Sequence, residues 1–501
     1  MSSNYDRLEL LMATRIHDRR SASIAIALVI SSVVVLGLLY IVAESASVGI
    51  ASVGVVLLAL AVVTVLASAM KYEHAAGILL LFCLGLSGLK LDVGPVSVLP
   101  EHLAIAVLTL HLIRSKLNSK AVQSSSTLLS AAFLLTAWFA IAITTSIVAA
   151  PLPAQSLKLC MWLAIGFYGL ILVYKSDRSA ESWARDSAGV AIAYASICIV
   201  GWITEQIAGS ASLFAERDYN NGFIRAKGLM LEPNILASFL LMSLCVSLAF
   251  ASKIKPSMLV MQFATSGFLI FVSLTRVSWP IYALLATIFY LRHASFRTWY
   301  FTAVSAVTAV FVFPRVGPTL GLGSEFVDTL QQRFTDLFDT SSGTGRSRSY
   351  SADNALEIIR NTGWWIGRGV NAYPQTEINE TASNGQDYLS FWWLALIYDT
   401  GLIGALLFVG ALVLVALRLG RRGILITLTI VLVSITTNPL WYAYPWVLLG
   451  IVLKKHSEDS NMFDKYNDQN ANARSRSSGS GGQIVRLDDR AVGPTKLRVV
   501  P

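Results

Sequence analysis

Long apolar stretches recur along most of this 501-residue chain, and they constrain its fold more than any other feature. A helix needs about 17 to 25 predominantly apolar residues to cross the hydrocarbon core of a bilayer. Only 14% of the residues are charged, against about 25% in a typical soluble domain. The sequence therefore predicts an all-α polytopic membrane protein with about 14 transmembrane helices (range about 12 to 14). The predicted spans lie near 23–43, 48–70, 75–90, 97–113, 127–150, 156–174, 187–208, 233–252, 257–275, 277–292, 298–314, 387–417, 423–437 and 440–453.

Lysine and arginine are concentrated on every second segment between these spans, beginning with four arginines before the first span. Because basic segments face the cytoplasm, the net charge of +9 is expected mainly to orient the protein. We expect no nucleic-acid partner. The predicted regions are a cytoplasmic N-terminus (1–22), transmembrane helices 1–11 (23–314), a large periplasmic or extracellular loop (315–386), transmembrane helices 12–14 (387–455) and a disordered cytoplasmic tail (456–501).

A minority of the cations lie on the predicted outer side, where the positive-inside rule expects few. Arginine binds phosphate oxygens in a bidentate geometry that lysine does not provide, so outward arginines indicate an anionic ligand. The alternative for each is a solvated arginine paired with a loop carboxylate. Arg276 lies at a membrane boundary, where an uncompensated charge is costly, so we expect it to have a functional role. The alternative is that its side chain extends to the polar interface. The outward cations are Arg217, Arg225, Lys227 and Arg276, and in the long loop Arg315, Arg333, Arg346, Arg348, Arg360 and Arg368.

The long loop also contains local structural signals. The apolar residues of Glu325–Leu330 and Ala352–Arg360 are spaced as on one face of a helix, and Gly343-Thr344-Gly345 between them predicts a turn. Trp364 and Trp365 are predicted to lie on the membrane surface as amphipathic anchors.

Outside the loop, four cysteines are predicted to be buried because they lie in apolar runs without metal-ligand spacing. They are Cys83, Cys160, Cys198 and Cys245.

Four motifs, taken in order, resemble those of the O-antigen ligase and Wzy-type polysaccharide polymerase superfamily, and the resemblance covers about residues 220–455. It implies a metal-independent and cofactor-free glycosyltransferase of the GT-C-like class in the bacterial cytoplasmic membrane. Its active face would point outward, and its donor would be a polyprenyl-diphosphate-linked glycan. The motifs are Arg225-Ala226-Lys227-Gly228-Leu229-Met230-Leu231-Glu232-Pro233-Asn234; Leu274-Thr275-Arg276; Arg348 with Ala355–Ile359 and Gly367-Arg368-Gly369-Val370-Asn371; and Asp399-Thr400-Gly401-Leu402-Ile403-Gly404.

The favoured activity within this resemblance is polymerisation of lipid-linked oligosaccharide repeats into a surface polysaccharide, such as O-antigen, capsule or exopolysaccharide. Ligases of the family carry a His-Asn pair before the last motif, and the corresponding stretch 382–391 has no histidine. This difference favours a polymerase over a ligase that transfers lipid-linked glycan to an acceptor. A polysaccharide transporter or flippase is a further alternative, although the chain has no recognisable inverted repeat. Candidate partners are the membrane lipid, a flippase and a chain-length regulator.

Transfer from a diphosphate requires stabilisation of the charge on the leaving group, and the sequence contains no visible cluster of metal ligands. The residues predicted to complement that charge are Arg225, Arg276 and Arg348. Asp387 is predicted to accept the proton of the acceptor hydroxyl, with a helix N-cap as its alternative. The predicted substrate-binding or positioning residues are Lys227, Glu232, Asn234, Arg346 and Arg368. Glu232 and Asn234 also suit the start of a helix, which is the structural alternative for both.

Overall fold

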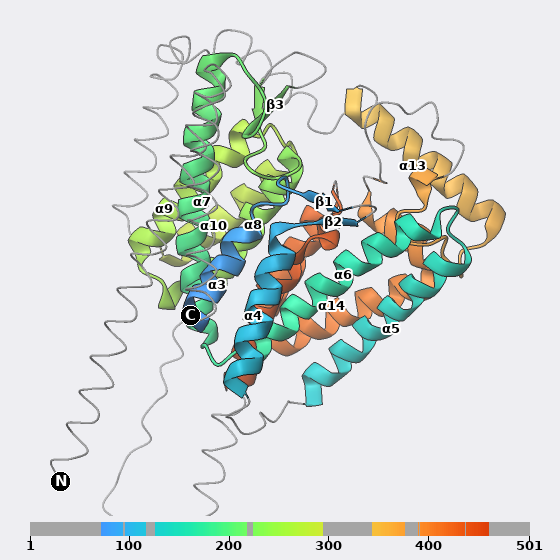
Figure 1. The fold of residues 1–501 in the computed structure, drawn as a ribbon, viewed down its shortest axis with the longest axis horizontal. Coiled ribbons are helices and arrows are strands. Elements are labelled where there is room, and N and C mark those ends of the chain that lie inside the picture. Colours follow the sequence, from blue (N-terminus) through green and yellow to red (C-terminus); the bar gives the residue numbers. More distant parts are fainter. Residues whose placement is uncertain are drawn as a thin grey trace, which may run out of the picture. The chain divides into compact units, whose positions relative to one another are not determined.

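The computed structural model describes residues 72–93, 96–116, 126–217, 224–293, 343–375, 389, 391–435 and 437–459, and this part of the chain is mostly helical (Figure 1). Its helices are α3 (Glu73–Cys83), α4 (Pro100–Lys116), α5 (Ser126–Val148), α6 (Pro153–Lys175), α7 (Ala180–Ala208), α8 (Pro233–Ala249), α9 (Pro256–Val272), α10 (Ser278–His293), α13 (Gly343–Thr362), α14 (Trp392–Val433) and a last helix over 443–459. Several predictions lie outside the described residues, namely the first two spans, the span near 298–314, the helix at Glu325–Leu330, Asp387 and the tail from 460.

Four of the described helices are long and apolar enough to cross a membrane. They are Ser130–Val148 within α5, Pro153–Lys175 (α6), Ala180–Ala208 (α7) and Trp392–Val433 (α14). The chain is therefore a mostly helical, multi-pass membrane protein, as its apolar pattern predicts. Helices α8, α9 and α10 also coincide with predicted spans but contain only 16 or 17 residues each.

The predicted span near 75–90 is only partly helical. Its helix, α3, has 11 residues. A helix of that length rises about 16 Å, roughly half of the hydrocarbon core. The chain then turns at Gly88, whose amide donates to the Leu229 carbonyl at 3.0 Å. A side chain at Gly88 would overlap the Met230 carbonyl. Close packing against a distant segment, which composition does not reveal, therefore ends this predicted span early.

Two short antiparallel hairpins correct the prediction of an all-α fold. Strand β1 (Leu91–Val93) pairs with β2 (Val96–Val98), and β3 (Ala215–Arg217) pairs with β4 (Ile224–Ala226). Each strand has three residues, which is too short for an alternating pattern to be recognised in the sequence. In the second hairpin, Glu216 lies opposite Arg225, and this pair belongs to the candidate site.

Helix α14 covers the predicted spans near 387–417 and 423–437 and is broken at two glycines. Gly401 has φ 71° and ψ 175°, and Gly420 has φ 56° and ψ −135°; glycine adopts positive φ values at little steric cost. The Gly420 break makes a helical hairpin, in which Thr427 Oγ1 donates to the Leu412 carbonyl at 3.4 Å. This break falls between the two predicted spans. The Gly401 break lies inside a predicted span and organises part of the candidate site.

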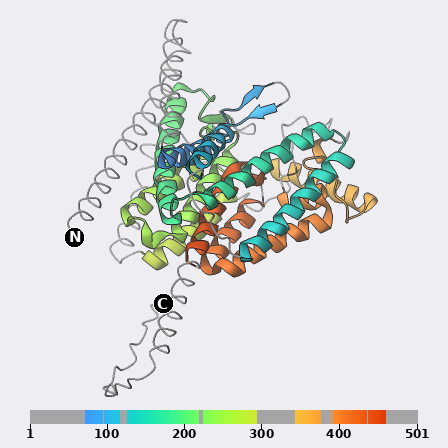
Figure 2. The same cartoon turned by 60° about the horizontal axis from the view of Figure 1, so that its bottom comes forward.

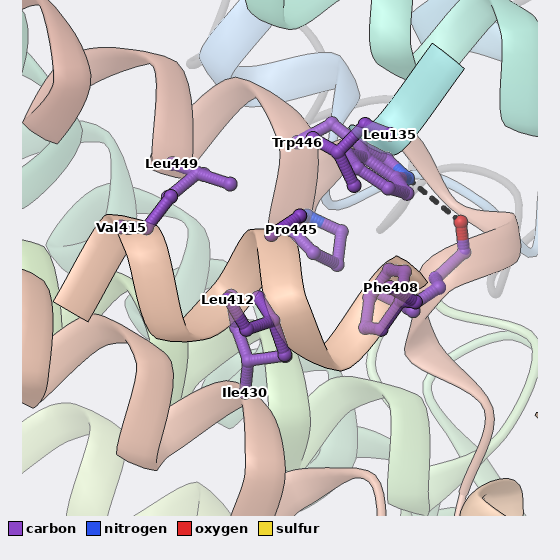
Figure 3. Close-up of a pocket in the computed structure, with 10 residues that line it drawn as sticks. Leu135, Phe408, Leu412, Val415, Ile430, Pro445, Trp446 and Leu449 are labelled. Atoms are coloured by element: carbon purple, nitrogen blue, oxygen red, sulfur yellow. Dashed lines mark hydrogen bonds between the residues drawn. The ribbon is translucent and has the colours of Figure 1, made fainter. Parts of the chain in front are cut away.

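The apolar core is one cluster of buried residues that runs through α3–α10, α14 and the last helix; within it α14 packs on α5 and α8, and α13 lies at one end of the α5–α14 pair (Figures 1 and 2). The Trp138 ring lies 4.8 Å from the Phe408 ring and 6.2 Å from the Trp446 ring, measured between centroids. Beside them is an apolar cavity of about 10 Å³, in which Trp446 Nε1 donates to the Leu440 carbonyl at 2.8 Å (Figure 3). A volume of about 10 to 15 Å³ holds a single water at most, so this cavity is a packing gap and not a substrate site.

Candidate functional site

The first two motifs of the sequence contact each other. Arg225 lies in β4, and its Nε donates to the Ser273 carbonyl at 3.0 Å, at the start of the turn that carries Arg276. The Thr275 hydroxyl donates to Asn234 Oδ1 at 3.2 Å, which ties the same turn to the beginning of α8. The fold therefore brings Arg225 and Asn234 to the α9–α10 turn, although they belong to a different motif.

The α9–α10 turn is held in an unusual backbone conformation. Leu274 has φ 53°, a left-handed value that costs a non-glycine residue about 1 to 3 kcal/mol. The Ser273 hydroxyl stabilises the turn, because it donates to the Ile270 carbonyl at 2.8 Å and accepts from the Thr275 amide at 3.4 Å. Arg276 is half-buried in this turn. Strain of this kind is found at functional sites when surrounding contacts over-determine it, as they do here.

The Arg225 side chain has an acidic neighbour that the motif does not include. Its Nη1 lies 3.8 Å from Glu216 Oε1, on the opposite strand of the hairpin, and both side chains are partly exposed. A partly exposed pair at this distance contributes little to stability. We interpret Glu216 as a residue that orients the Arg225 guanidinium. Lys227 follows the strand, and its amide donates to the Phe214 carbonyl at 3.0 Å.

Glu205 is a site-supporting residue that sequence reasoning missed. It is fully buried at the end of α7, where its carboxylate accepts the amides of Ser212, Leu213 and Phe214 at 2.8 to 3.2 Å and the Ser212 hydroxyl at 3.0 Å. These bonds fix the segment that leads into β3, and so they fix the hairpin that carries Arg225. The available signal was an acidic residue at the end of an apolar run, four positions before Gly209.

The third and fourth motifs also contact each other, at the Gly401 break of α14. In an unbroken helix the Leu402 amide would bond to the Tyr398 carbonyl. Here it donates to the Trp364 carbonyl at 2.8 Å, and the Tyr398 carbonyl accepts the Arg368 amide at 2.7 Å. The break thus exchanges one helical hydrogen bond for two bonds to the loop that follows α13.

Asp399 strengthens this junction with both its backbone and its side chain. Its carbonyl accepts the Gly369 amide and the Thr145 hydroxyl of α5, each at 3.0 Å. Its carboxylate, in a residue that is 7% exposed, hydrogen-bonds with the backbone amides of Asn371 and Ala372. The loop over 367–372 is therefore clamped to α14 and α5, and we call this arrangement the Asp399 clamp.

Two glycines make the clamp sterically possible. A side chain at Gly367 would overlap the Asp399 carbonyl, and a side chain at Gly401 would overlap the Trp365 carbonyl. Gly401 also has a positive φ, as do Gly369 (98°) and Asn371 (52°). Close approach of two backbones therefore explains why glycines occupy positions 367 and 401.

The clamp holds Arg368, a cation for which the described part of the chain provides no acidic partner. Among the described residues, the half-buried Arg368 side chain makes no hydrogen bond or ion pair. Its charge lies near the buried Tyr398 hydroxyl, which has no hydrogen-bond partner within the described ranges. An arginine held by its backbone but not neutralised by a carboxylate is suited to bind an anionic ligand.

The remaining predicted residues are placed less completely. Arg346 and Arg348 fall within α13, and Asp387 lies outside the described residues. The N-cap of α14 is Phe391, so the alternative of an N-cap at Asp387 is wrong. Glu232 is the N-cap of α8 but makes no side-chain capping bond.

Two further predictions concern the loop and the cysteines. The helix at Ala352–Arg360 is confirmed within α13, whereas the turn at Gly343-Thr344-Gly345 is wrong because α13 begins at Gly343. The glycines are tolerated at the start of that helix because its stability comes from Ala355 and Ile359, which are buried. The four cysteines are buried and free, as predicted. No group of three potential metal ligands occurs within the described ranges.

No known family model matches this chain, and no curated protein sequence is similar to it.

Proposed function

We propose that the protein polymerises polyprenyl-diphosphate-linked oligosaccharide repeat units into a surface polysaccharide at the outer face of the bacterial cytoplasmic membrane. The observation that carries the proposal is the pairing of the four motifs. Arg225 and Asn234 bond to the turn of the second motif, and the Gly367–Asn371 stretch bonds to the fourth motif at Asp399. Motifs matched only by chance would have no reason to meet in this way.

The proposal includes the topology that the charges predict. In it the chain crosses the membrane about 14 times, with a cytoplasmic N-terminus and with 315–386 as the outward loop. The four long apolar helices support a multi-pass arrangement. The helical hairpin at Gly420 further supports the order of the last spans, because its turn contains three arginines, as a cytoplasmic turn should.

The proposed reaction is a glycosyl transfer between two lipid-linked glycans. A hydroxyl oxygen of the acceptor attacks the anomeric carbon of the donor, and a new glycosidic bond forms. The bond between that carbon and the diphosphate oxygen breaks, and polyprenyl diphosphate leaves with the electron pair. The hydroxyl proton passes to a base, for which Asp387 remains the sequence-based candidate.

Arginines carry the electrostatic part of this reaction in our proposal. Negative charge develops on the bridging oxygen of the diphosphate as its bond to carbon breaks, and cations placed there in advance lower the barrier. Arg368, held by the Asp399 clamp with no acidic partner among the described residues, is the cation best prepared for a diphosphate. Arg225 and Arg276 at the first motif pair, and Arg348 on α13, complete the proposed set.

Deletion of the gene, followed by analysis of lipid-linked glycans, tests the activity. A polymerase predicts that single repeats accumulate on polyprenyl diphosphate at the outer surface, where periodate added to spheroplasts oxidises them. Single repeats protected from periodate would instead indicate the flippase alternative, and long polymer retained on the lipid would indicate a ligase. Normal polymer export would contradict all three activities.

Complementation of the deletion with Arg368→Ala tests the site. We expect no polymer from this variant and normal polymer from Arg360→Ala, a matched control at an exposed arginine of α13. Equal polymer from both variants would contradict the role of Arg368.

A further inference from the structure

Three consecutive large apolar side chains are exposed directly after α13. Trp364, Trp365 and Ile366 are 39%, 63% and 76% exposed, respectively. We call these three residues the Trp364–Ile366 loop. Gly363, with φ 99°, ends α13 and directs the chain away from the helix. Contiguous exposed apolar side chains of this size mark a surface that contacts a partner.

The loop is attached rigidly to α14 at the Gly401 break. The Trp364 carbonyl accepts the Leu402 amide at 2.8 Å, and the Trp365 carbonyl packs so closely on Gly401 that no side chain fits there. Because α14 is a candidate membrane-spanning helix, its position in the bilayer also determines the depth of the loop.

The length of α14 places the Gly401 break at the edge of the hydrocarbon core. The basic turn that begins with Arg418 marks the opposite, polar boundary. Between them, Leu402–Leu417 rises about 24 Å, whereas the hydrocarbon core is about 30 Å thick. A break only about 24 Å from the far boundary lies a few ångströms inside the near one.

Helix α5 gives an independent estimate of the same depth. Thr145 bonds to the Asp399 carbonyl at 3.0 Å, so it lies level with the break. From Ser126, the start of α5, to Thr145 the helix rises about 29 Å, close to the thickness of the hydrocarbon core of about 30 Å. Val148, one turn further along α5, is 80% exposed, as expected where lipid and not water surrounds the helix.

We propose that the Trp364–Ile366 loop inserts into the bilayer at the boundary between acyl chains and headgroups, so that its partner is the lipid itself. Tryptophan is suited to this zone because its ring is apolar and its indole N–H remains a donor to polar headgroups. The loop continues the exposed apolar face of α14, where Ile403 and Leu406 are also exposed. This inference is independent of the reaction that the protein catalyses.

Site-directed spin labelling of the full-length protein tests the insertion. A nitroxide is attached to Trp365→Cys and, separately, to Ile366→Cys, after reconstitution into phosphatidylethanolamine–phosphatidylglycerol vesicles. The four native cysteines are buried and do not compete for the label. Leu406→Cys, on the exposed face of α14, is the lipid control, and Glu357→Cys, at an exposed position of α13, is the water control.

The ratio of nitroxide collision rates with oxygen and with a polar nickel complex distinguishes the outcomes, because oxygen concentrates in the acyl region and the nickel complex in water. We expect a ratio at positions 365 and 366 that is several-fold above that at 357 and close to that at 406. A ratio equal to that at 357 would overturn the proposal. Low collision rates with both reagents would also overturn it, since protein would then cover the loop.

Discussion

The Thr275 hydroxyl donates a hydrogen bond to Asn234 Oδ1 over 3.2 Å, and so joins the turn between α9 and α10 to the start of α8. The two residues lie 41 positions apart in the sequence. Their contact, together with the bond from Arg225 to the Ser273 carbonyl, holds two arginine-bearing segments in one place. Removing it should therefore affect both stability and activity.

The variant Thr275→Val removes this donor while keeping the side-chain shape. We expect a loss of about 0.5 to 1.5 kcal/mol in the free energy of unfolding, and reduced polymer because Arg276 is less well held. Thermal unfolding in detergent measures the first effect, and polymer length on a gel measures the second. Thr265→Val is the matched control, since Thr265 bonds only to carbonyls of its own helix. Identical behaviour of the two variants would contradict the role of the Thr275–Asn234 contact.

Arg276→Ala should abolish polymer while the protein remains inserted and abundant. Loss of one electrostatic donor to a developing oxyanion costs on the order of 10²–10³ in rate, which is enough to remove detectable product. Quantitative immunoblotting of membranes and analysis of polymer measure the two properties. The exposed Arg292 provides a matched control at the other end of α10, and Arg292→Ala should be neutral. Normal polymer from Arg276→Ala would exclude Arg276 from the site.

Gly401→Ala should destabilise the protein strongly. The new methyl group would meet the Trp365 carbonyl at a backbone φ of 71° and ψ of 175°, and this conformation, essentially restricted to glycine, alone costs about 1 to 3 kcal/mol. Gly410→Ala in the same helix is the control, because its nearest neighbour would be Leu134 Cδ1 at an ordinary 3.5 Å. It should be neutral or stabilise α14 by up to about 1 kcal/mol. Unfolding temperatures that fall equally in both variants would argue against close approach at Gly401.

Asp399→Ala should release the Arg368 loop from α14. The Asn371 amide would lose its acceptor, at about 1 to 3 kcal/mol for an unsatisfied group, whereas the Ala372 amide keeps its bond to the Gly369 carbonyl at 3.1 Å. Trypsin should then cleave after Arg368 more rapidly, as peptide mass spectrometry reveals, and polymer should decrease. Asp399→Asn keeps one acceptor oxygen and should give intermediate cleavage. Asp353→Ala, at an exposed position of α13, should leave the cleavage rate unchanged. Unchanged cleavage in Asp399→Ala would show that the carboxylate does not hold the loop.

Apolar length and charge were sufficient to predict the membrane-spanning character of α5, α6, α7 and α14, because insertion depends on composition summed over a helix. They were not sufficient for α3, whose end depends on the packing of Gly88 against Leu229 and Met230. The strands of the β3–β4 hairpin escaped prediction for a similar reason. They are held by Glu205 through the segment at 212–214, and not by a pattern of their own.

Some features of the candidate site can likewise be predicted from the sequence, and others depend on the tertiary structure. Residue types and their order made Arg225, Arg276, Arg368 and Asn234 candidates, because arginines suit an anionic ligand and these positions lie in the motifs. Sequence order could not show that Asp399 clamps the loop beneath Arg368, or that Glu216 faces Arg225. Such pairings depend on the backbone conformations at Gly401 and at the β3–β4 hairpin, which bring together groups that are distant in the chain. Local composition therefore specified the apolar helices and the types of side chain near them. Three-dimensional packing specified which of these side chains lie in contact.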